Sequence, residues 1–335
     1  MRKLIFLSLL IMGFILGACN SESTTEKSNQ DGSNSTESET TESGSEGDNK
    51  LTIGMTVINQ EALFFTEMVK GAEAKAEELG VELNVYNANN NQVDQNNAVE
   101  NFISEGVDAI IVNAIDPGAL NPVVEKVEEA GISLISVDSV IEHEAVDVQI
   151  GVDNSEESVR MGEYFNEFKE EHWGDKEVKL GIVSALNAPI QVNRQDSFLE
   201  TVESDSVEVV DIVDGENVQE KALTASENLF ISNPDLDAVF VTGEPAYIGA
   251  VSAVNSQGKQ DSVKLFGWDL SPQVVQGIDQ GYVESVIQQH PDKYGEEAVK
   301  SAVSLINGEE VESLIGVPAT IVTEDNVDDF RSLFE

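Results

Sequence analysis

Two aspartates, Asp138 and Asp269, each follow an apolar segment that is typical of a buried β-strand, at 132–137 and at 263–268. The carboxyl ends of parallel strands meet at one edge of a sheet, and open α/β sheets bind their ligands there. A carboxylate only accepts hydrogen bonds, so each aspartate can hold two hydroxyl groups of a bound molecule. Either side chain can also cap the turn that follows its strand. The pattern therefore predicts a polar binding site, with turn capping as the alternative.

A third strand end carries an amide. Val107–Val112 is a nearly continuous β-branched run, which is typical of a strand buried on both faces, and Asn113 ends it. The stretch 107–117 is nearly repeated at 236–245, where Gly243 follows the strand-like run. Asn113 could join the predicted site or only bond the neighbouring backbone. Two similar α/β units are thus expected to contribute to one site.

A pair of adjacent phenylalanines opens the first predicted helix. Apolar residues between Phe64 and Leu79 recur at helical spacing and form one face. Phe64 and Phe65 are neighbours in sequence, so both cannot face the core at the start of one helix. We therefore expect at least one of them to line the binding cleft.

The elements that position these residues alternate between strand and helix from Leu51 onward, which predicts parallel sheets wound in a right-handed sense. The expected fold is α/β, with two doubly wound parallel-sheet lobes. The predicted strands are 51–58, 81–86, 107–112, 132–137, 146–151, 178–183, 207–213, 237–241, 263–268, 283–288 and 319–322. The predicted helices are 64–79, one ending near 106, 118–130, 154–171, 190–202, 218–231, 246–257, 272–281 and 291–306.

The N-terminus predicts export. Arg2 and Lys3 precede a mostly apolar run, Leu4–Leu16, that is too short to span a membrane but fits a secretory signal. The residues Leu16-Gly17-Ala18-Cys19 resemble the lipobox of bacterial lipoproteins, which implies cleavage before Cys19 and lipidation of its thiol. Asn20–Lys50 contains no apolar residue, so residues 19–50 are expected to form a disordered tether after a signal peptide at 1–18.

Charge and missing motifs exclude several classes of protein. The formal net charge of −45 would repel nucleic acid and anionic lipid headgroups, so membrane contact is expected only through the lipid anchor. The sequence has no phosphate-binding GxxxxGK[ST], no GxGxxG opening a helix, no HExxH and no GxSxG. With one cysteine and three scattered histidines, we expect no metal, no cofactor and no enzymatic activity. A monomer is expected.

Several short stretches share one pattern, among them Thr52-Ile53-Gly54, Phe64-Phe65, Val137-Asp138, Phe266-Gly267-Trp268-Asp269 and Gln289-His290-Pro291-Asp292. Together they resemble the ribose-type periplasmic sugar-binding proteins, and the resemblance extends over residues 51–335. The resemblance implies two lobes that are joined by three crossings and close on a ligand like a hinge. The lobes would be 51–153 plus 290–318 and 154–289 plus 319–335.

The resemblance also assigns roles to individual residues. Phe64 and Phe65 match ring-stacking aromatics, and the positions that match polar contacts to sugar hydroxyls are Asn113, Asp138, Arg194, Asp269 and Gln289. Ser139 stands where ribose binders carry arginine, Gly243 where they carry asparagine, and Asn217 near the place of an aromatic. These departures argue against ribose and imply a larger or differently decorated ligand.

The expected function is that of a lipoprotein on the outer face of the cell membrane. It would capture a monosaccharide or sugar-like polyol and deliver it to an ABC-type permease. A ligand-sensing protein for chemotaxis or quorum sensing is the alternative on the same fold. A secreted glycosidase using Asp138 and Asp269, the effector domain of a lactose-repressor-type regulator, and an amino-acid binder using Arg194 are further alternatives.

Overall fold

The computed structural model describes residues 50–61, 63–202, 204 and 206–334. The chain divides into two units, Met1–Asp48 and Asn49–Glu335, and every feature below belongs to the second. The predicted signal peptide, Cys19 and residues 19–49 of the predicted tether lie outside the described residues.

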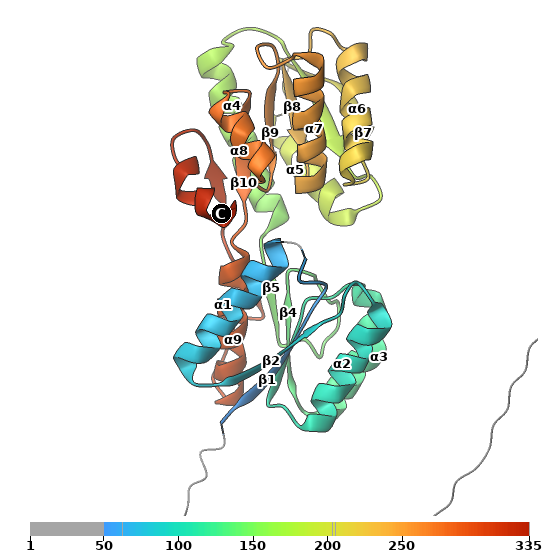
Figure 1. Cartoon of the computed structure of the whole chain (residues 1–335), viewed down its shortest axis with the longest axis vertical. Coiled ribbons are helices and arrows are strands. Elements are labelled where there is room, and N and C mark those ends of the chain that lie inside the picture. Colours follow the sequence, from blue (N-terminus) through green and yellow to red (C-terminus); the bar gives the residue numbers. More distant parts are fainter. Residues whose placement is uncertain (1–49, 62, 203, 205, 335) are drawn as a thin grey trace, which may run out of the picture. The chain divides into compact units, whose positions relative to one another are not determined.

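The second unit contains two lobes, each built on its own sheet (Figure 1). In the N-terminal lobe the strand order is β11-β5-β4-β3-β1-β2, and all neighbouring strands are parallel. The strands are β1 Thr52–Val57, β2 Glu82–Asn87, β3 Ala109–Val112, β4 Ser133–Val137, β5 Val148–Gly151 and β11 Leu314–Gly316. The helices of this lobe are α1 Leu63–Leu79, α2 Gln92–Glu105, α3 Pro117–Ala130 and α9 Pro291–Ile306.

The C-terminal lobe repeats this plan. Its strand order is β12-β10-β9-β8-β6-β7, with only the β10–β12 pair antiparallel. The strands are β6 Val178–Ser184, β7 Val207–Asp214, β8 Ala238–Val241, β9 Lys264–Trp268, β10 Val283–Gln288 and β12 Thr320–Val322. The helices are α4 Asn154–His172, α5 Pro189–Val202, α6 Gln219–Ser232, α7 Glu244–Gln257 and α8 Pro272–Asp279, followed by a C-terminal 3₁₀ helix, η1 Val327–Phe334.

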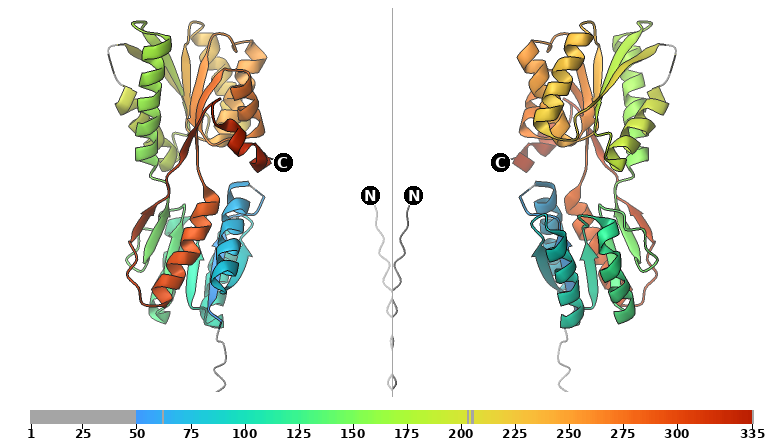
Figure 2. Two further views of the ribbon diagram at one scale, coloured as in Figure 1. Left: turned by 90° about the vertical axis from the view of Figure 1, so that its left-hand side faces the viewer. Right: turned by 90° about the vertical axis from the view of Figure 1, so that its right-hand side faces the viewer.

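Each sheet is covered by helices on both faces, as Figure 2 shows. In the N-terminal lobe α1 and α9 cover one face, and α2 and α3 cover the other. In the C-terminal lobe α4 and α5 lie opposite α6, α7 and α8. Burial on both faces explains why central strands such as Ala109–Val112 and Ala238–Val241 are apolar at every position.

The chain passes between the lobes three times, between β5 and α4, between β10 and α9, and between β11 and β12. The predicted α/β class with two doubly wound lobes and three crossings is therefore confirmed. Most predicted elements agree with the structure to within two residues at each end. Two short elements, β11 and η1, were not predicted. None of the described helices is long and apolar enough to cross a membrane.

Helices α1 and α9 pack unusually closely, and this contact positions the start of both helices at the site. A Cβ atom on Gly71 of α1 would lie 1.9 Å from the carbonyl oxygen of Asp292. A Cβ atom on Gly295 of α9 would lie 2.0 Å from the carbonyl oxygen of Met68. Only glycine fits at these two contacts, which fix Phe64 and Phe65 relative to the chain that enters α9.

Candidate functional site

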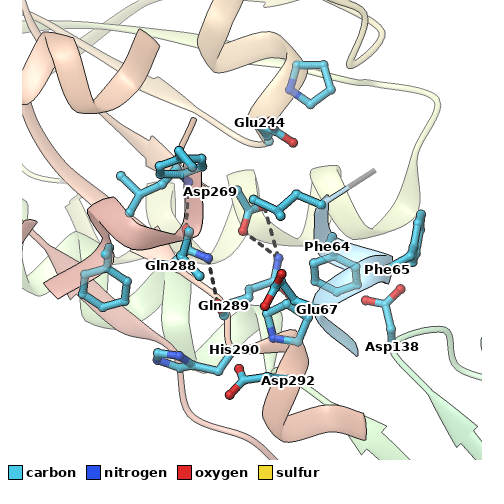
Figure 3. Close-up of a pocket in the computed structure, with 18 of the residues that line it drawn as sticks. Phe64, Phe65, Glu67, Asp138, Glu244, Asp269, Gln288, Gln289, His290 and Asp292 are labelled. Atoms are coloured by element: carbon cyan, nitrogen blue, oxygen red, sulfur yellow. Dashed lines mark hydrogen bonds between the residues drawn. The ribbon is translucent and has the colours of Figure 1, made fainter. Parts of the chain in front are cut away.

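A pocket of about 620 Å³ lies where the carboxyl ends of strands from both lobes face each other (Figure 3). The N-terminal lobe contributes the start of α1, the residue after β4 and the start of α9. The C-terminal lobe contributes α5, the loops after β7, β8, β9 and β10, and the helix η1. Of the predicted site residues, those that line this pocket are Phe64, Phe65, Asp138, Arg194, Gly243, Asp269 and Gln289.

The two strand-end aspartates occupy equivalent positions in the two lobes. Asp138 follows β4 and Asp269 follows β9, with left-handed φ angles of 66° and 65°. Their backbone N–H groups donate to the carbonyl oxygens of Ile150 (2.7 Å) and Ile287 (2.8 Å), at the ends of the neighbouring strands. Left-handed backbone is tolerated by aspartate better than by most residues but still costs free energy. Strain at two matching positions is a mark of a functional site.

The carboxylate of Asp138 is held from behind by Asn113. The amide nitrogen of Asn113 lies 3.2 Å from Asp138 Oδ2 and 3.1 Å from the carbonyl oxygen of Val137. Its amide oxygen accepts from the backbone N–H of Ile58 at 3.4 Å. Asn113 is fully buried and does not line the pocket, so its contact with the pocket lining is the hydrogen bond to Asp138.

The carboxylate of Asp269 is held by Gln289. Gln289 Nε2 lies 2.9 and 3.1 Å from the two carboxylate oxygens, and the Tyr294 hydroxyl donates to Gln289 Oε1 at 3.1 Å. Tyr294 belongs to α9, so a chain of hydrogen bonds runs from the N-terminal lobe to the C-terminal aspartate. Because an ionised carboxylate only accepts hydrogen bonds, the Gln289 amide is oriented with its nitrogen toward Asp269.

Arg194 projects from α5 and is held on three sides. Its Nε donates to Asn154 Oδ1 at 2.7 Å and its Nη1 donates to the carbonyl oxygen of Thr242 at 3.0 Å. Its guanidinium carbon lies 3.6 Å from the ring centre of Trp268, which is fully buried. Trp268 therefore supports Arg194 from beneath. The guanidinium reaches Asp269 Oδ2 at 3.8 Å.

Burial dominates the electrostatics of this group. It raises the pKa of Asp138 to about 6, although Arg194 and the Asn113 hydrogen bond oppose the rise. Burial also raises the pKa of Asp269, against the effects of Arg194 and Gln289. The guanidinium of Arg194 has its pKa lowered by burial, against the attraction of both aspartates. Two acids and one base thus line the same pocket with pKa values that burial shifts toward their neutral forms.

Phe64 and Phe65 both line the pocket and both are partly buried. Their rings meet edge to face with centroids 5.4 Å apart, and Phe64 also contacts Tyr294 edge to face at 6.0 Å. These contacts fix two apolar ring surfaces opposite the polar groups of the C-terminal lobe. A ring with one apolar face and several hydroxyls matches such a pocket.

Ser139 does not line the pocket, although it follows Asp138 directly. Its hydroxyl oxygen accepts the backbone N–H of Ala114 at 2.6 Å, and its carbonyl oxygen accepts a hydrogen bond from the Ser136 hydroxyl. Ser139 thus stabilises the turn that aims Asp138. Gly243, by contrast, does line the pocket, just before α7.

Sequence reasoning missed several lining residues. Gln191 lies on the same helix as Arg194 and Glu244 is the residue after Gly243, so each was adjacent to a predicted position. Others come from segments that gave no signal, among them Phe330, Leu333 and Phe334 of η1. The complete additional lining comprises Leu63, Glu67, Gln191, Asn217, Glu244, Pro245, Leu270, Gln288, His290, Pro291, Asp292, Asp329, Phe330, Leu333 and Phe334.

The chain is similar over nearly its whole length to proteins of known role. It is 26% identical over 324 residues to the ribose import binding protein RbsB of Bacillus subtilis, covering 97% of this chain and 100% of the relative. It is also 26% identical to the Escherichia coli ribose import binding protein RbsB, covering 82% of this chain and 91% of that protein. These relatives are transporter substrate-binding proteins and not enzymes.

Solved structures agree with this fold. A solute-binding protein of Bacillus halodurans with bound myo-inositol is 26% identical and superposes with a TM-score of 0.73, covering 86% of this chain and all of the other. The arabinose-binding protein AraP of Geobacillus stearothermophilus shares only 21% identity but has a TM-score of 0.76, over 84% of this chain and 99% of its own. The model of the periplasmic binding protein domain matches residues 53–310. The chain therefore belongs to the periplasmic binding protein family, in the type I class that contains the ribose-binding proteins.

Proposed function

We propose that this protein captures a monosaccharide or sugar-like polyol in the pocket between its lobes. The observation that carries the proposal is that Asp138 and the rings of Phe64 and Phe65, from the N-terminal lobe, line one pocket with Arg194 and Asp269 from the C-terminal lobe. Acceptors and donors alternate across this group, as the hydroxyls of a sugar require. Relatives named for import of ribose, and a solved neighbour with bound myo-inositol, support the same ligand class.

The proposed contacts account for useful affinity. Hydrogen bonds to charged groups contribute about 1.5–3 kcal/mol each. Three such groups, Asp138, Arg194 and Asp269, together with the aromatic pair, suffice for micromolar binding, which requires about 8 kcal/mol. Gln289 would hold Asp269 and Asn113 would hold Asp138 in the geometry that the ligand needs.

A thermal-shift screen of the purified protein against pentoses, hexoses, inositols and amino acids tests this proposal, with calorimetry on each hit. A ligand at 100 times its Kd stabilises the fold by about 2.7 kcal/mol, which moves the melting temperature visibly. We expect a sugar or polyol to shift the melt and Asp269→Ala to abolish the shift. A shift only with amino acids would contradict the proposed ligand class.

We further propose that Cys19 carries a lipid and that the protein is anchored to the outer face of the cell membrane. The Leu16-Gly17-Ala18-Cys19 sequence supports this proposal. In a bacterial host, the wild-type protein should partition into the detergent phase and carry labelled fatty acid. Cys19→Ser should lose both properties. Label that persists on Cys19→Ser would refute the anchor.

Delivery to an ABC-type permease is the third part of the proposal, supported by the import role in the names of the ribose relatives. Deleting the gene should abolish uptake of the labelled ligand by the native host, and an Asp269→Ala copy should fail to restore it. If the deletion leaves uptake intact but removes a behavioural response to the ligand, the sensing alternative is correct.

A further inference from the structure

A second group of polar side chains in the pocket gathers around Gly243. A Cβ atom on Gly243 would lie 2.7 Å from Asn217 Oδ1, and 2.8 and 3.1 Å from Nε2 and Oε1 of Gln191. Two amides from α5 and the loop after β7 therefore occupy the space that a side chain would fill. Glu244 follows at the first position of α7 and also lines the pocket. We call Gln191, Asn217, Gly243 and Glu244 the Gly243 subsite.

The acceptors of this subsite lack donors. Gln191 is only 8% exposed, yet its Oε1 has no hydrogen-bond partner among the described residues. Asn217 Oδ1 is buried and equally unpaired within the described part of the chain. An unpaired buried acceptor costs about 1–3 kcal/mol. A ligand that donates an N–H or O–H group to each of these two acceptors would remove the cost at both.

The subsite also carries uncompensated negative charge. The Glu244 carboxylate makes no hydrogen bond or ion pair with any described residue. Although more than a third of Glu244 is exposed, partial burial and the neighbouring Asp269 carboxylate raise its pKa to about 7. A carboxylate with a raised pKa is a strong partner for a cation that approaches it.

The rest of the pocket does not supply that cation. Of the other lining acids, Glu67 and Asp292 are paired with Lys70 and Lys293. Arg194 lines the pocket together with the carboxylates of Asp138, Asp269 and Glu244. Arg194 already donates to Asn154 and Thr242. When these three acids are ionised, their carboxylates and Arg194 together carry a formal charge of about −2, which favours a positive ligand.

We propose that the Gly243 subsite binds a protonated amino group, so that the ligand is an amino sugar or an aminated polyol. An ammonium group has three donors and no acceptor, which matches Gln191 Oε1, Asn217 Oδ1 and the Glu244 carboxylate. A hydroxyl has one donor and leaves the charge uncompensated. This inference rests on the proposed sugar-binding function and narrows its ligand class.

Calorimetry with matched sets of ligands tests the inference on the purified protein at neutral pH. Two sets are triplets, namely D-glucose, D-glucosamine and N-acetyl-D-glucosamine and the three galactose counterparts. A third set is the pair of myo-inositol and an amino-deoxy-inositol. We expect at least one amine to bind about ten-fold or more tightly than its neutral and acetylated counterparts, a difference of about 1.4 kcal/mol. Acetylation removes the charge and keeps the ring.

Variants assign the effect to the subsite. Glu244→Gln should remove about ten-fold of the preference for the amine over the neutral sugar. Glu208→Gln makes the same charge change on the exposed amino end of β7, outside the pocket, and should have no effect. Gln191→Leu, which removes an acceptor without adding charge, should weaken the amine in a protein that melts normally.

The outcomes separate this inference from the function on which it rests. A neutral sugar that binds as tightly as its amine, or an amine preference that Glu244→Gln leaves intact, overturns the inference while the sugar-binding function stands. If no member of these sets binds and the thermal-shift screen finds no pentose, hexose or inositol that binds, the proposed function fails and the inference fails with it.

Discussion

Gln289 holds the carboxylate of Asp269 from one side, with its amide nitrogen 2.9 and 3.1 Å from the two oxygens. The residue lies where β10 crosses to α9, and its amide oxygen accepts from Tyr294 of the other lobe. The crossing that joins the lobes therefore also orients a proposed ligand contact. This arrangement links the conformation of the hinge to the geometry of the pocket.

Removing the Gln289 amide should weaken ligand binding. Gln289→Ala frees Asp269 to rotate and removes hydrogen bonds to a charged group that are worth about 1.5–3 kcal/mol each. We expect the Kd for the ligand found in the screen to rise about ten-fold or more by calorimetry. Gln273→Ala on the exposed face of α8 is the control and should bind like the wild type. Unchanged affinity in Gln289→Ala would show that Asp269 needs no such support.

Asp138 should destabilise the ligand-free protein at neutral pH. Its pKa is raised from 3.8 to about 6 in the folded protein, so the folded state holds this proton more tightly than the unfolded state. The contribution of this group to the free energy of unfolding therefore falls as the pH rises from about 4 to about 6, and it stays low at higher pH. The integrated loss is about 3 kcal/mol.

The variant Asp138→Asn isolates this effect because it cannot ionise. Chemical denaturation of both proteins, without ligand, should show that the stability advantage of Asp138→Asn grows by up to about 3 kcal/mol between pH 4 and pH 7. The variant should also bind ligand poorly. A difference between the two proteins that does not vary with pH would mean that the carboxylate is not buried in solution.

The sequence alone predicted the polar residues at the ends of the strands. Asp138 and Asp269 each end an apolar run, and topology alone brings the ends of parallel strands to one edge. The alternating elements predicted the two doubly wound lobes for the same reason. Helix positions were harder to assign, since Arg194 became a candidate only through the family resemblance and not through the periodicity of its helix.

The remaining lining of the pocket depends on three-dimensional packing. Gln191 enters the pocket because Gly243 lacks a side chain. The two residues are 52 positions apart, and no sequence motif connects them. The short strand Leu314–Gly316 and the helix Val327–Phe334 gave no periodic signal. The conformations of these two segments depend on packing against elements that are distant in sequence. The local residue pattern does not encode such packing.

The close contact between α1 and α9 should tolerate no side chain. Gly295→Ala places a methyl group about 2.0 Å from the backbone oxygen of Met68, so the helices must separate. Overpacking of this kind costs about 1–3 kcal/mol. The matched control is Gly118→Ala in α3, where the nearest atom would be 3.4 Å away and alanine should stabilise the helix by about 0.5–1 kcal/mol. Opposite signs are expected in denaturant titrations, and stabilisation by Gly295→Ala would contradict the packing.

Arg194 should not be replaceable by lysine. The guanidinium uses Nε on Asn154, Nη1 on the Thr242 carbonyl and its flat face on Trp268 at the same time. A lysine ammonium has neither the fixed set of N–H donors nor the planar face of a guanidinium. Arg194→Lys therefore keeps the charge but loses these three contacts. We expect ligand affinity to fall by at least about ten-fold, although the formal charge of the pocket is unchanged. Arg331→Lys, in an exposed ion pair with Asp279, is the matched control and should bind normally. Full affinity in Arg194→Lys would mean that charge alone matters at this position, and the alternating donors and acceptors proposed for sugar recognition would have to be reassigned.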